Sequence, residues 1–526
     1  MRRKKTSSKI FQLYFLVLTI NLPFCPTGQA QGLSGKKSKI DYLGQKPPGM
    51  NAELYAPGLI STDSFEHSTP AFSPDGNQVL WTLIYRGEPS FIMEMKKENG
   101  VWTNPFRASF SDHSADDIYQ SFSVDGEKLY FGSRRKMPSG YPEGKGIRVW
   151  EVARNADGWG VPVPFDTTVS KGEDYAHSTN REGDMYFSFR RRGGAEFDIA
   201  WAPKIGGKYG SPSKLPYGIN TTDYEDGPFI APDGSYLIFE SGRLNGIENS
   251  IDLYISFRNK DGSWRLPLNM GEKINTKYAE RFARLSPDGK YLFFGSTKPQ
   301  SANSIGFDAY WIDAKIIAQL KEQSRHLKTI DQKLGDEILA TQYERDYTKT
   351  ATLLPAWLAQ HPTDLNAQYD YTLALRKSKQ NELAEKIVIA QTTRWPNDLN
   401  FQKERVLVSY AAGKTQEAES HLSSLIARVQ QPAETYLSLA NELYGMAKYW
   451  ESASVYEKAL TIRANGGDYY NLGCCYALLN EKNRAMEALK KAIDLGFNRK
   501  EQYETDTDLD VLRTDAQFQA LLGLLK

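Results

Sequence analysis

The sequence is poor in cysteine. Its 526 residues include three cysteines, Cys25, Cys474 and Cys475. Cys474 and Cys475 are neighbours in a helix-prone stretch, so their side chains face different directions and we expect no disulfide between them. This usage excludes a disulfide scaffold and a CxxC metal pair.

An excess of charge of one sign is lacking as well. The chain has 65 Lys and Arg residues against 64 Asp and Glu residues, a formal net charge of +1. The chain therefore lacks the excess of basic residues that is typical of nucleic-acid-binding proteins, so we expect no nucleic-acid partner. The chain also contains no GxSxG, HExxH or P-loop motif, and its six histidines show no metal-ligand spacing.

Long apolar runs are lacking outside the N-terminus. A basic start (residues 2–5) precedes the apolar stretch Phe11–Leu22, which is too short to span a bilayer comfortably. Small residues up to Ala30 complete the pattern of a signal peptide cleaved before Gln31. The alternative is lipid attachment at Cys25. We therefore expect an exported chain with no membrane-spanning segment in its mature form.

What the sequence does contain is repetition. "SPDGKYLFFGS" (Ser286–Ser296) is one of five similar stretches that join an acid-glycine turn to an alternating apolar segment. The turn glycines are Gly76, Gly126, Gly183, Gly234 and Gly289, so one unit is about 50 to 57 residues long. Four of the units also carry an aromatic residue three positions before a proline. These pairs are Trp102 and Pro105, Trp159 and Pro162, Tyr209 and Pro212, and Trp264 and Pro267.

Each unit contains the signals of four short strands, and four-stranded units of this period predict a β-propeller. The fifth unit ends after its third strand, Phe307–Lys315, where the pattern becomes helical. An unassigned outer strand, Glu53–Leu59, lies at the other end of the chain. We expect it to pair with the fifth blade and close a ring of five.

These motifs, "SPDG…LYF.S" followed by "DIY", resemble the WD-like repeats of TolB-type propellers from Gram-negative cell envelopes. "DYLGQKPPG" before the first blade and "DAYWIDAKII" after the last are similar to one subgroup of these proteins. The resemblance covers roughly residues 41–317 and implies a five-bladed propeller. It implies no single function, because propellers serve as enzymes, transport partners and scaffolds.

The rest of the chain resembles tetratricopeptide repeats. "HPTDLN" and "WPNDLN", at His361 and Trp395, recur 34 residues apart, which is the period of this family. We count about five helix pairs and a terminal cap, the pairs beginning near Asp331, Leu365, Leu399, Ala433 and Gly466.

The predicted organisation is a signal peptide (1–30), a propeller (31–315), a linker helix (316–330) and a tetratricopeptide solenoid with its cap (331–526). Because each folded part has a pattern of its own, we expect a cut between residues 315 and 330 to leave two folded pieces.

Eight residues before each turn acid lies a titratable side chain, and equivalent positions of a propeller form a ring. The ring consists of His67, Asp117, Asp174, Glu225 and Glu280. One interpretation is that these acids pair with blade arginines, for which Arg134, Arg190 and Arg243 are the natural donors. The other interpretation is that the ring binds a divalent cation or a basic peptide, with His67 as the one ligand that is not a carboxylate. We expect no other cofactor.

In tetratricopeptide proteins, set positions of each first helix line a concave groove. Carried onto this chain, the groove residues are Asn366, Tyr369, Arg376, Asn400, Lys403, Tyr410, Asn441 and Tyr444. Amides, phenols and cations suit an extended peptide, although an ordinary solvated face has the same composition.

The function predicted from the sequence is an exported, non-catalytic interaction scaffold of the cell envelope, periplasmic or associated with the outer membrane. It would bind a protein or peptide through the propeller funnel and the groove. The alternative is a propeller enzyme or polysaccharide-binding protein with a metal or substrate site in the funnel. Some polyuronate lyases that resemble these propellers hold a metal with funnel histidines, and His67, His113 and His177 lie in loops leading into successive blades.

Overall fold

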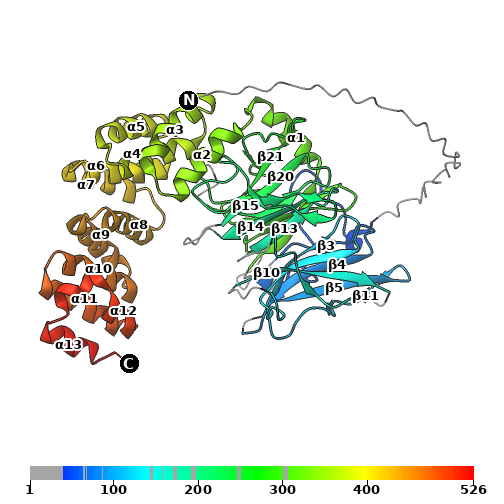
Figure 1. Ribbon diagram of the computed structural model, residues 1–526, viewed down its shortest axis with the longest axis horizontal. Helices are drawn as coiled ribbons and strands as arrows, with labels where there is room; N and C mark the ends of the chain where they lie inside the picture. Colours follow the sequence, from blue (N-terminus) through cyan, green and yellow to red (C-terminus); the bar gives the residue numbers. More distant parts are fainter. Residues whose placement is uncertain are drawn as a thin grey trace, which may run out of the picture. The chain divides into compact units, whose positions relative to one another are not determined.

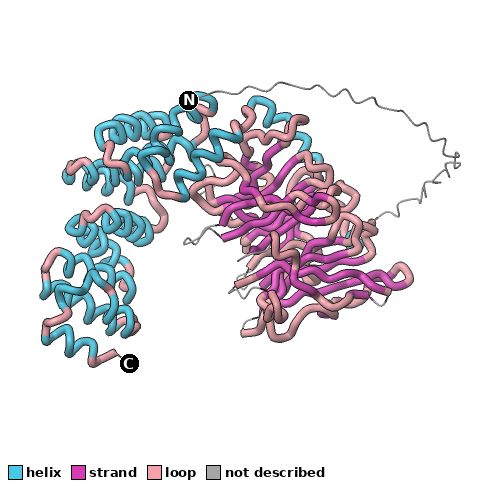
Figure 2. Tube along the Cα trace, viewed as in Figure 1, coloured by secondary structure: helices cyan, strands magenta, loops and turns pink. Residues whose placement is uncertain are grey.

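The computed structural model describes residues 40–525, except 63–64, 67, 86, 142–145, 157, 170–173, 191–196, 245, 247–249 and 300–305. The predicted signal peptide and the start of the mature chain lie outside these residues. Strands occupy the first part of the described chain and helices the second (Figure 2).

The strands form five blades, each an antiparallel sheet, and one additional hairpin. A short 3-10 helix, Tyr42–Gly44, precedes them. The first blade is β2 (Phe65–Glu66) with β3 (Ala71–Phe72), β4 (Gln78–Ile84), β5 (Phe91–Glu98), β6 (Val101–Trp102) and β7 (Phe106–Arg107). The second is β8 (Asp117–Phe122), β9 (Lys128–Ser133), β10 (Arg148–Asn155), β11 (Gly158–Trp159) and β12 (Val163–Pro164).

The third blade is β13 (Asp174–Thr179), β14 (Met185–Arg190), β15 (Phe197–Ala202) and β18 (Ser213–Lys214), with the hairpin β16 (Lys204–Ile205) and β17 (Lys208–Tyr209). The fourth is β19 (Glu225–Ile230), β20 (Tyr236–Ser241), β21 (Asp252–Phe257) and β22 (Leu268–Asn269). The fifth is β23 (Glu280–Leu285), β24 (Tyr291–Ser296) and β25 (Asp308–Asp313), joined by β1 (Glu53–Leu54). Figure 1 shows several of these sheets, coloured from blue to green.

The predicted closure is confirmed. Glu53 pairs with Trp311 and Leu54 with Tyr310, so the start of the described chain forms the outer strand of the last blade. Tyr55 follows this strand and is fully buried, with its ring 5.0 Å from those of Phe293 and Trp311. The closing strand therefore anchors an aromatic core as well as hiding two sheet edges.

The repeated turns have a common backbone reason. Gly76, Gly126, Gly183, Gly234 and Gly289 all adopt positive φ, between 69° and 85°. Most residues with a Cβ avoid this region, which explains why glycine recurs at this position. The repeated prolines have another role, since each directly precedes the short outer strand of its blade (β7, β12, β18 or β22).

The helices form five antiparallel pairs and a terminal cap, which is the predicted tetratricopeptide arrangement. The pairs are α2 (Gln332–Tyr343) with α3 (Tyr347–Gln360), α4 (Leu365–Lys377) with α5 (Asn381–Arg394), α6 (Leu399–Ala411) with α7 (Thr415–Ile426), α8 (Pro432–Gly445) with α9 (Tyr449–Ile462), and α10 (Gly466–Leu478) with α11 (Lys482–Asp494). The cap is α12 (Lys500–Thr505), a 3-10 turn (Thr507–Leu512) and α13 (Ala516–Leu522). Asp331, Asp364 and Asp398 cap α2, α4 and α6 by accepting from backbone N–H groups.

The segment that follows the fifth blade packs against the propeller. Helix α1 (Lys315–Gln323) buries Ile316 and Leu320 in the core of the fourth and fifth blades. Beyond a short 3-10 turn, Ser324–His326, the backbone N–H of Ile330 donates to the carbonyl of Trp264, at the edge of the fourth blade. The predicted linker thus contains a helix fixed to the strands.

One hydrophobic core crosses from the blades into the first helices. It combines Tyr217, Trp264 and neighbouring blade residues with Ile338, Trp357 and other residues of α2, α3 and α4. The rings of Tyr217 and Trp357 lie 5.0 Å apart. The change from strands to helices near residue 315 therefore does not separate two independent cores. Along residues 40–525, within the described ranges, no helix is long and apolar enough to cross a membrane.

Candidate functional site

Three of the five predicted ring residues are described in full, and all three are buried at the first position of an inner strand. Asp117 begins β8, Glu225 begins β19 and Glu280 begins β23, each with essentially no exposed surface. Asp174 begins β13, but its side chain lies outside the described residues, as does His67. The four acids therefore take equivalent positions in four blades, and the position of His67 stays a prediction.

Each of these acids is held by groups of its own blade. Glu280 accepts from the backbone N–H and hydroxyl of Thr276 at 2.8 and 2.7 Å, and from the Ser296 hydroxyl at 2.7 Å. Glu225 accepts from the corresponding groups of Thr221 and Ser241, at 2.7 to 2.8 Å. These contacts tie the loop before the inner strand to the end of the second strand.

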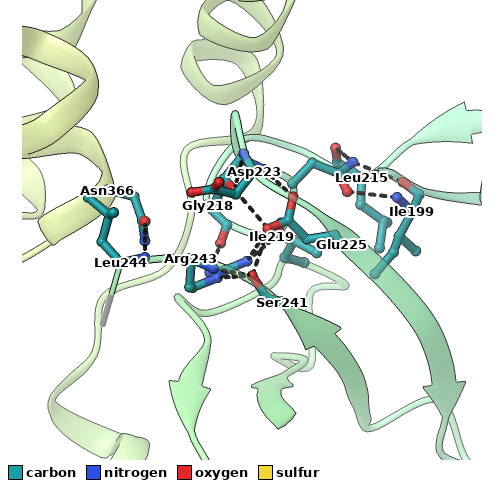
Figure 3. A network of polar contacts seen from close by, with 12 residues as sticks. Ile199, Leu215, Gly218, Ile219, Asp223, Glu225, Ser241, Arg243, Leu244 and Asn366 are labelled. Carbon is teal, nitrogen blue, oxygen red and sulfur yellow. Dashed lines mark hydrogen bonds and ion pairs between the residues drawn. The ribbon is translucent and has the colours of Figure 1, made fainter. Parts of the chain in front are cut away.

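Arginine completes this arrangement in two blades. Arg135 lies 2.7 Å from Asp117, and Arg243 lies 3.4 Å from Glu225. Burial raises the pKa of Asp117, and the nearby Arg135 opposes that rise. Figure 3 shows Arg243 beside Glu225 and the loop carbonyls of Gly218 and Ile219, to which it also donates.

The predicted arginine partners are partly wrong. Arg243 is correct, but Arg134 pairs with Asp116, and its neighbour Arg135 takes Asp117. Arg190 lies over the ring of Phe197; its predicted pairing with Asp174 stays a prediction, because the Asp174 side chain lies outside the described residues. The sequence does carry a signal that separates Arg135 from Arg134, because a serine stands two residues before Arg135, Arg190, Arg243 and the corresponding Lys298. In Arg135 and Arg243, Nε donates to that serine hydroxyl.

Two aromatic rings pack between inner strands of the propeller. Inner strands β8 and β23 each contain a bulge, at which Tyr119 and Phe282 adopt positive φ of 58° and 59°. Their rings are buried and lie 5.5 Å apart. Gly227 takes the same position in β19, where a Cβ would lie 2.1 Å from a Glu240 oxygen. Such backbone is unfavourable for residues other than glycine, so surrounding packing holds the two rings in the channel.

Beside these rings, the described residues enclose a small cavity of about 20 Å³. It is lined by Tyr119, His177, Ser178, Gly227, Pro228, Phe229, Phe282, Ala283 and Arg284. This space holds one water-sized group, so it does not admit a peptide or a sugar.

The three histidines suggested as a funnel set are not seen to gather there. His177 is buried in β13 and lines the cavity, whereas His113 is exposed and contacts Arg107. In the described part of the chain, one group has the composition of a metal site: Cys474, Asp506 and Asp508, in the last helix pair and the cap. Tyr470 and Tyr444 donate to these two carboxylates, and burial raises the pKa of the Cys474 thiol.

Most of the predicted groove residues are engaged within the molecule. Asn366 accepts from the backbone N–H of Leu244 in the propeller (Figure 3), and buried Arg376 pairs with Glu404 and Glu442. Tyr410 is buried and donates to Glu419.

The remaining groove candidates also have neighbours inside the molecule. Tyr444 donates to Asp508, Asn441 accepts from Tyr456, and Tyr369 packs near Phe401. Asn400 is half-buried at the start of α6.

Lys403 is the groove candidate that lines a pocket. This pocket has a volume of about 390 Å³ and lies between α6 and α8. Its lining consists of Leu399, Lys403, Arg428, Val429, Gln430, Gln431, Glu434 and Thr435. Burial lowers the pKa of the Lys403 ammonium, and none of the described side chains forms an ion pair with it within 4.0 Å. A cation without an acid partner in a pocket suits an acidic ligand.

No protein-family model matches the chain. Among curated proteins, it is 36% identical to a chloroplastic protein of Arabidopsis thaliana over 53 residues, which are 10% of this chain and 16% of that protein. Among solved structures, it is similar to TolB from Acinetobacter baumannii, at 18% identity and TM-score 0.28, over 39% of this chain and 43% of that one. MamA from Desulfovibrio magneticus RS-1 is another, at 15% identity and TM-score 0.24, over 31% of this chain and 92% of that one. The fold described above rests on the chain's own strand pairing and helix pairs.

Proposed function

We propose that this chain is an exported, non-catalytic interaction scaffold of the cell envelope, which binds an acidic segment of a protein partner between the first helices α6 and α8. The basic start and short apolar stretch of residues 2–22 support export to the periplasm or the periplasmic side of the outer membrane. The observation that carries the binding proposal is Lys403, which lines the pocket of about 390 Å³ between these helices.

The pocket has more positive than negative charge to offer, because its one acid, Glu434, is paired with Arg463. Lys403 and Arg428 supply positive charge, Gln430 and Gln431 supply amides, and Leu399 supplies apolar surface. Arg428 donates to the Pro396 carbonyl and the Asn397 side chain, which hold its guanidinium beside the pocket. Acidic-motif recognition by clustered cations is a common mode of peptide binding.

A peptide array tests this proposal. Acidic peptides are compared with copies in which every Asp and Glu is replaced by Asn or Gln, using labelled full-length mature protein. We expect the acidic set to bind, and Lys403→Glu to weaken that binding at least about tenfold, because it replaces an attraction with a repulsion. Lys490→Glu, on an exposed position of α11, is the matched control and should bind like the wild type. Equal binding of both peptide sets, or no effect of Lys403→Glu, contradicts the proposal.

A further inference from the structure

Two arginines of the inner strand β23 have opposite surroundings. Arg281 contacts Glu240 and lies 3.0 Å from Asp226, so two carboxylates surround its guanidinium. Arg284, three residues later, has no hydrogen bond or ion pair with any residue that the structure describes. Its Nε is buried, whereas the side chain as a whole is half-buried. One strand therefore carries a compensated and an uncompensated cation.

An uncompensated guanidinium at this place is unfavourable. Burial lowers the pKa of Arg284 to about 10, so the side chain keeps its charge at neutral pH. A buried N–H group without a hydrogen-bond partner is unfavourable, and an anion at hydrogen-bond distance from Nε would supply that partner.

The space beside Arg284 limits what that anion can be. The cavity beside it has a volume of about 20 Å³, and Tyr119, Phe282, Gly227 and Pro228 are among the residues that line it. About 10 to 15 Å³ of such volume holds one water molecule. Chloride is a little larger than water, whereas a peptide carboxylate with its chain does not fit. His177 lines the same space.

We propose that the centre of the propeller binds a small monovalent anion of the size of chloride, held by the guanidinium of Arg284. This site has the opposite charge preference from the cation ring considered from the sequence. It is separate from the Lys403 pocket, so either site can be disproved without the other. Its effect would be to stabilise the inner strands of four blades around one ion.

Bromide provides a direct test, because it replaces chloride and scatters anomalously. Crystals of the full mature protein are grown in sodium bromide, and data are collected at the bromine absorption edge. We expect an anomalous peak in contact with the Arg284 guanidinium. A peak elsewhere only, or ordinary water density at this position, overturns the proposal.

A solution measurement tests the energetic consequence. At constant ionic strength, the wild type should melt about 2 °C or more higher in sodium chloride than in sodium gluconate, whose anion is too large for the cavity. Arg284→Met should lose this difference. In gluconate it should be at least as stable as the wild type, since it removes a half-buried cation whose Nε has no hydrogen-bond partner among the described residues.

The control is Arg325→Met, which removes an arginine that is 72% exposed and paired with Glu322. It should keep the chloride response of the wild type. Equal melting of the wild type in both salts, or a chloride response that persists in Arg284→Met, overturns the proposal. If Arg284→Met does not fold, the bromide measurement on the wild type still decides the question.

Discussion

The hydroxyl of Tyr217, in the loop between β18 and β19, donates a hydrogen bond of 2.7 Å to Asp370 in helix α4. Thr222 of the same loop and Gln342 of α2 also donate to this carboxylate, each at 2.9 Å. One buried acid thus joins the propeller to two helices. Its titration should change the free energy of unfolding as the pH changes.

Asp370→Asn should change the pH dependence of unfolding. Burial raises the pKa of Asp370 to about 6, above its ordinary value of 3.8. The folded state therefore binds the proton more tightly, and the group's favourable contribution is present below about pH 4 and lost as the pH rises through 6. Relative to the wild type, the variant should gain on the order of 3 kcal/mol in free energy of unfolding between pH 4 and pH 7.5.

Urea unfolding at several pH values measures this difference. Glu337→Gln, at an exposed position of α2, is the control and should follow the wild type. A constant difference between Asp370→Asn and the wild type would show that Asp370 does not titrate in this range.

The buried acids of the blades should prove structural. Arg135→Met leaves Asp117 buried without its cation and should cost about 3–5 kcal/mol of unfolding free energy. Arg134→Met removes the neighbouring and more exposed pair with Asp116 and should cost about 0–1 kcal/mol. Denaturant unfolding of these adjacent variants separates the two roles. Calorimetric Ca²⁺ binding that Asp117→Asn with Glu225→Gln abolishes in a folded protein would instead favour the cation ring.

Closure of the propeller should depend on Tyr55. Tyr55→Ala removes a fully buried ring between Phe293 and Trp311 and should cost about 3–5 kcal/mol. Glu53→Ala, two residues earlier at an exposed position of strand β1, should change stability by less than about 0.5 kcal/mol. Thermal unfolding of both variants checks this, and similar losses in the two would mean that the strand pairing alone closes the ring.

The blades and the first helices should unfold together. Trp357 is fully buried against Tyr217, so Trp357→Ala should weaken the shared core and split one calorimetric transition into two. Leu422→Ala, in the solenoid core of α7, should lower stability without separating the blades from α2 and α3. Two transitions already in the wild type would show that the shared core does not couple the regions.

Export remains a prediction from the sequence. Mature protein purified from a periplasmic fraction should begin near Gln31, as determined by N-terminal sequencing. An intact initiator methionine contradicts cleavage, and a lipid on Cys25 would show the alternative processing.

The sequence predicts the elements better than it predicts the site. Positive φ at the turn glycines and capping by Asp364 and Asp398 are local effects, so motif spacing located the turns and the helix starts. Whether Arg134 or Arg135 pairs with Asp117 depends on the side of the strand end on which each side chain lies. The sequence pattern predicted Arg134, whereas the partner is Arg135.

Contacts between residues that are far apart in the sequence could not be predicted from the repeat motifs. The contact between Tyr217 and Asp370 joins residues with no shared motif, because it depends on how an entire blade meets a helix. The packing of Tyr119 and Phe282 between the inner strands depends on bulges in β8 and β23. The segments "DIYQSF" and "ERFARL" contain no sign that Tyr119 or Phe282 adopts positive φ.

The closing strand also sets an order on folding. The hydroxyl of Ser61 donates to the carbonyl of Ala309, 248 positions away, and β1 has no partner until β25 exists. During synthesis, or during passage through a membrane in an extended form, four blades can be complete while the ring is still open. Ring closure is then a late event with a large loop-closure entropy. Until it occurs, the outer edge of the fifth blade and the unpaired strand β1 are exposed and prone to wrong pairing.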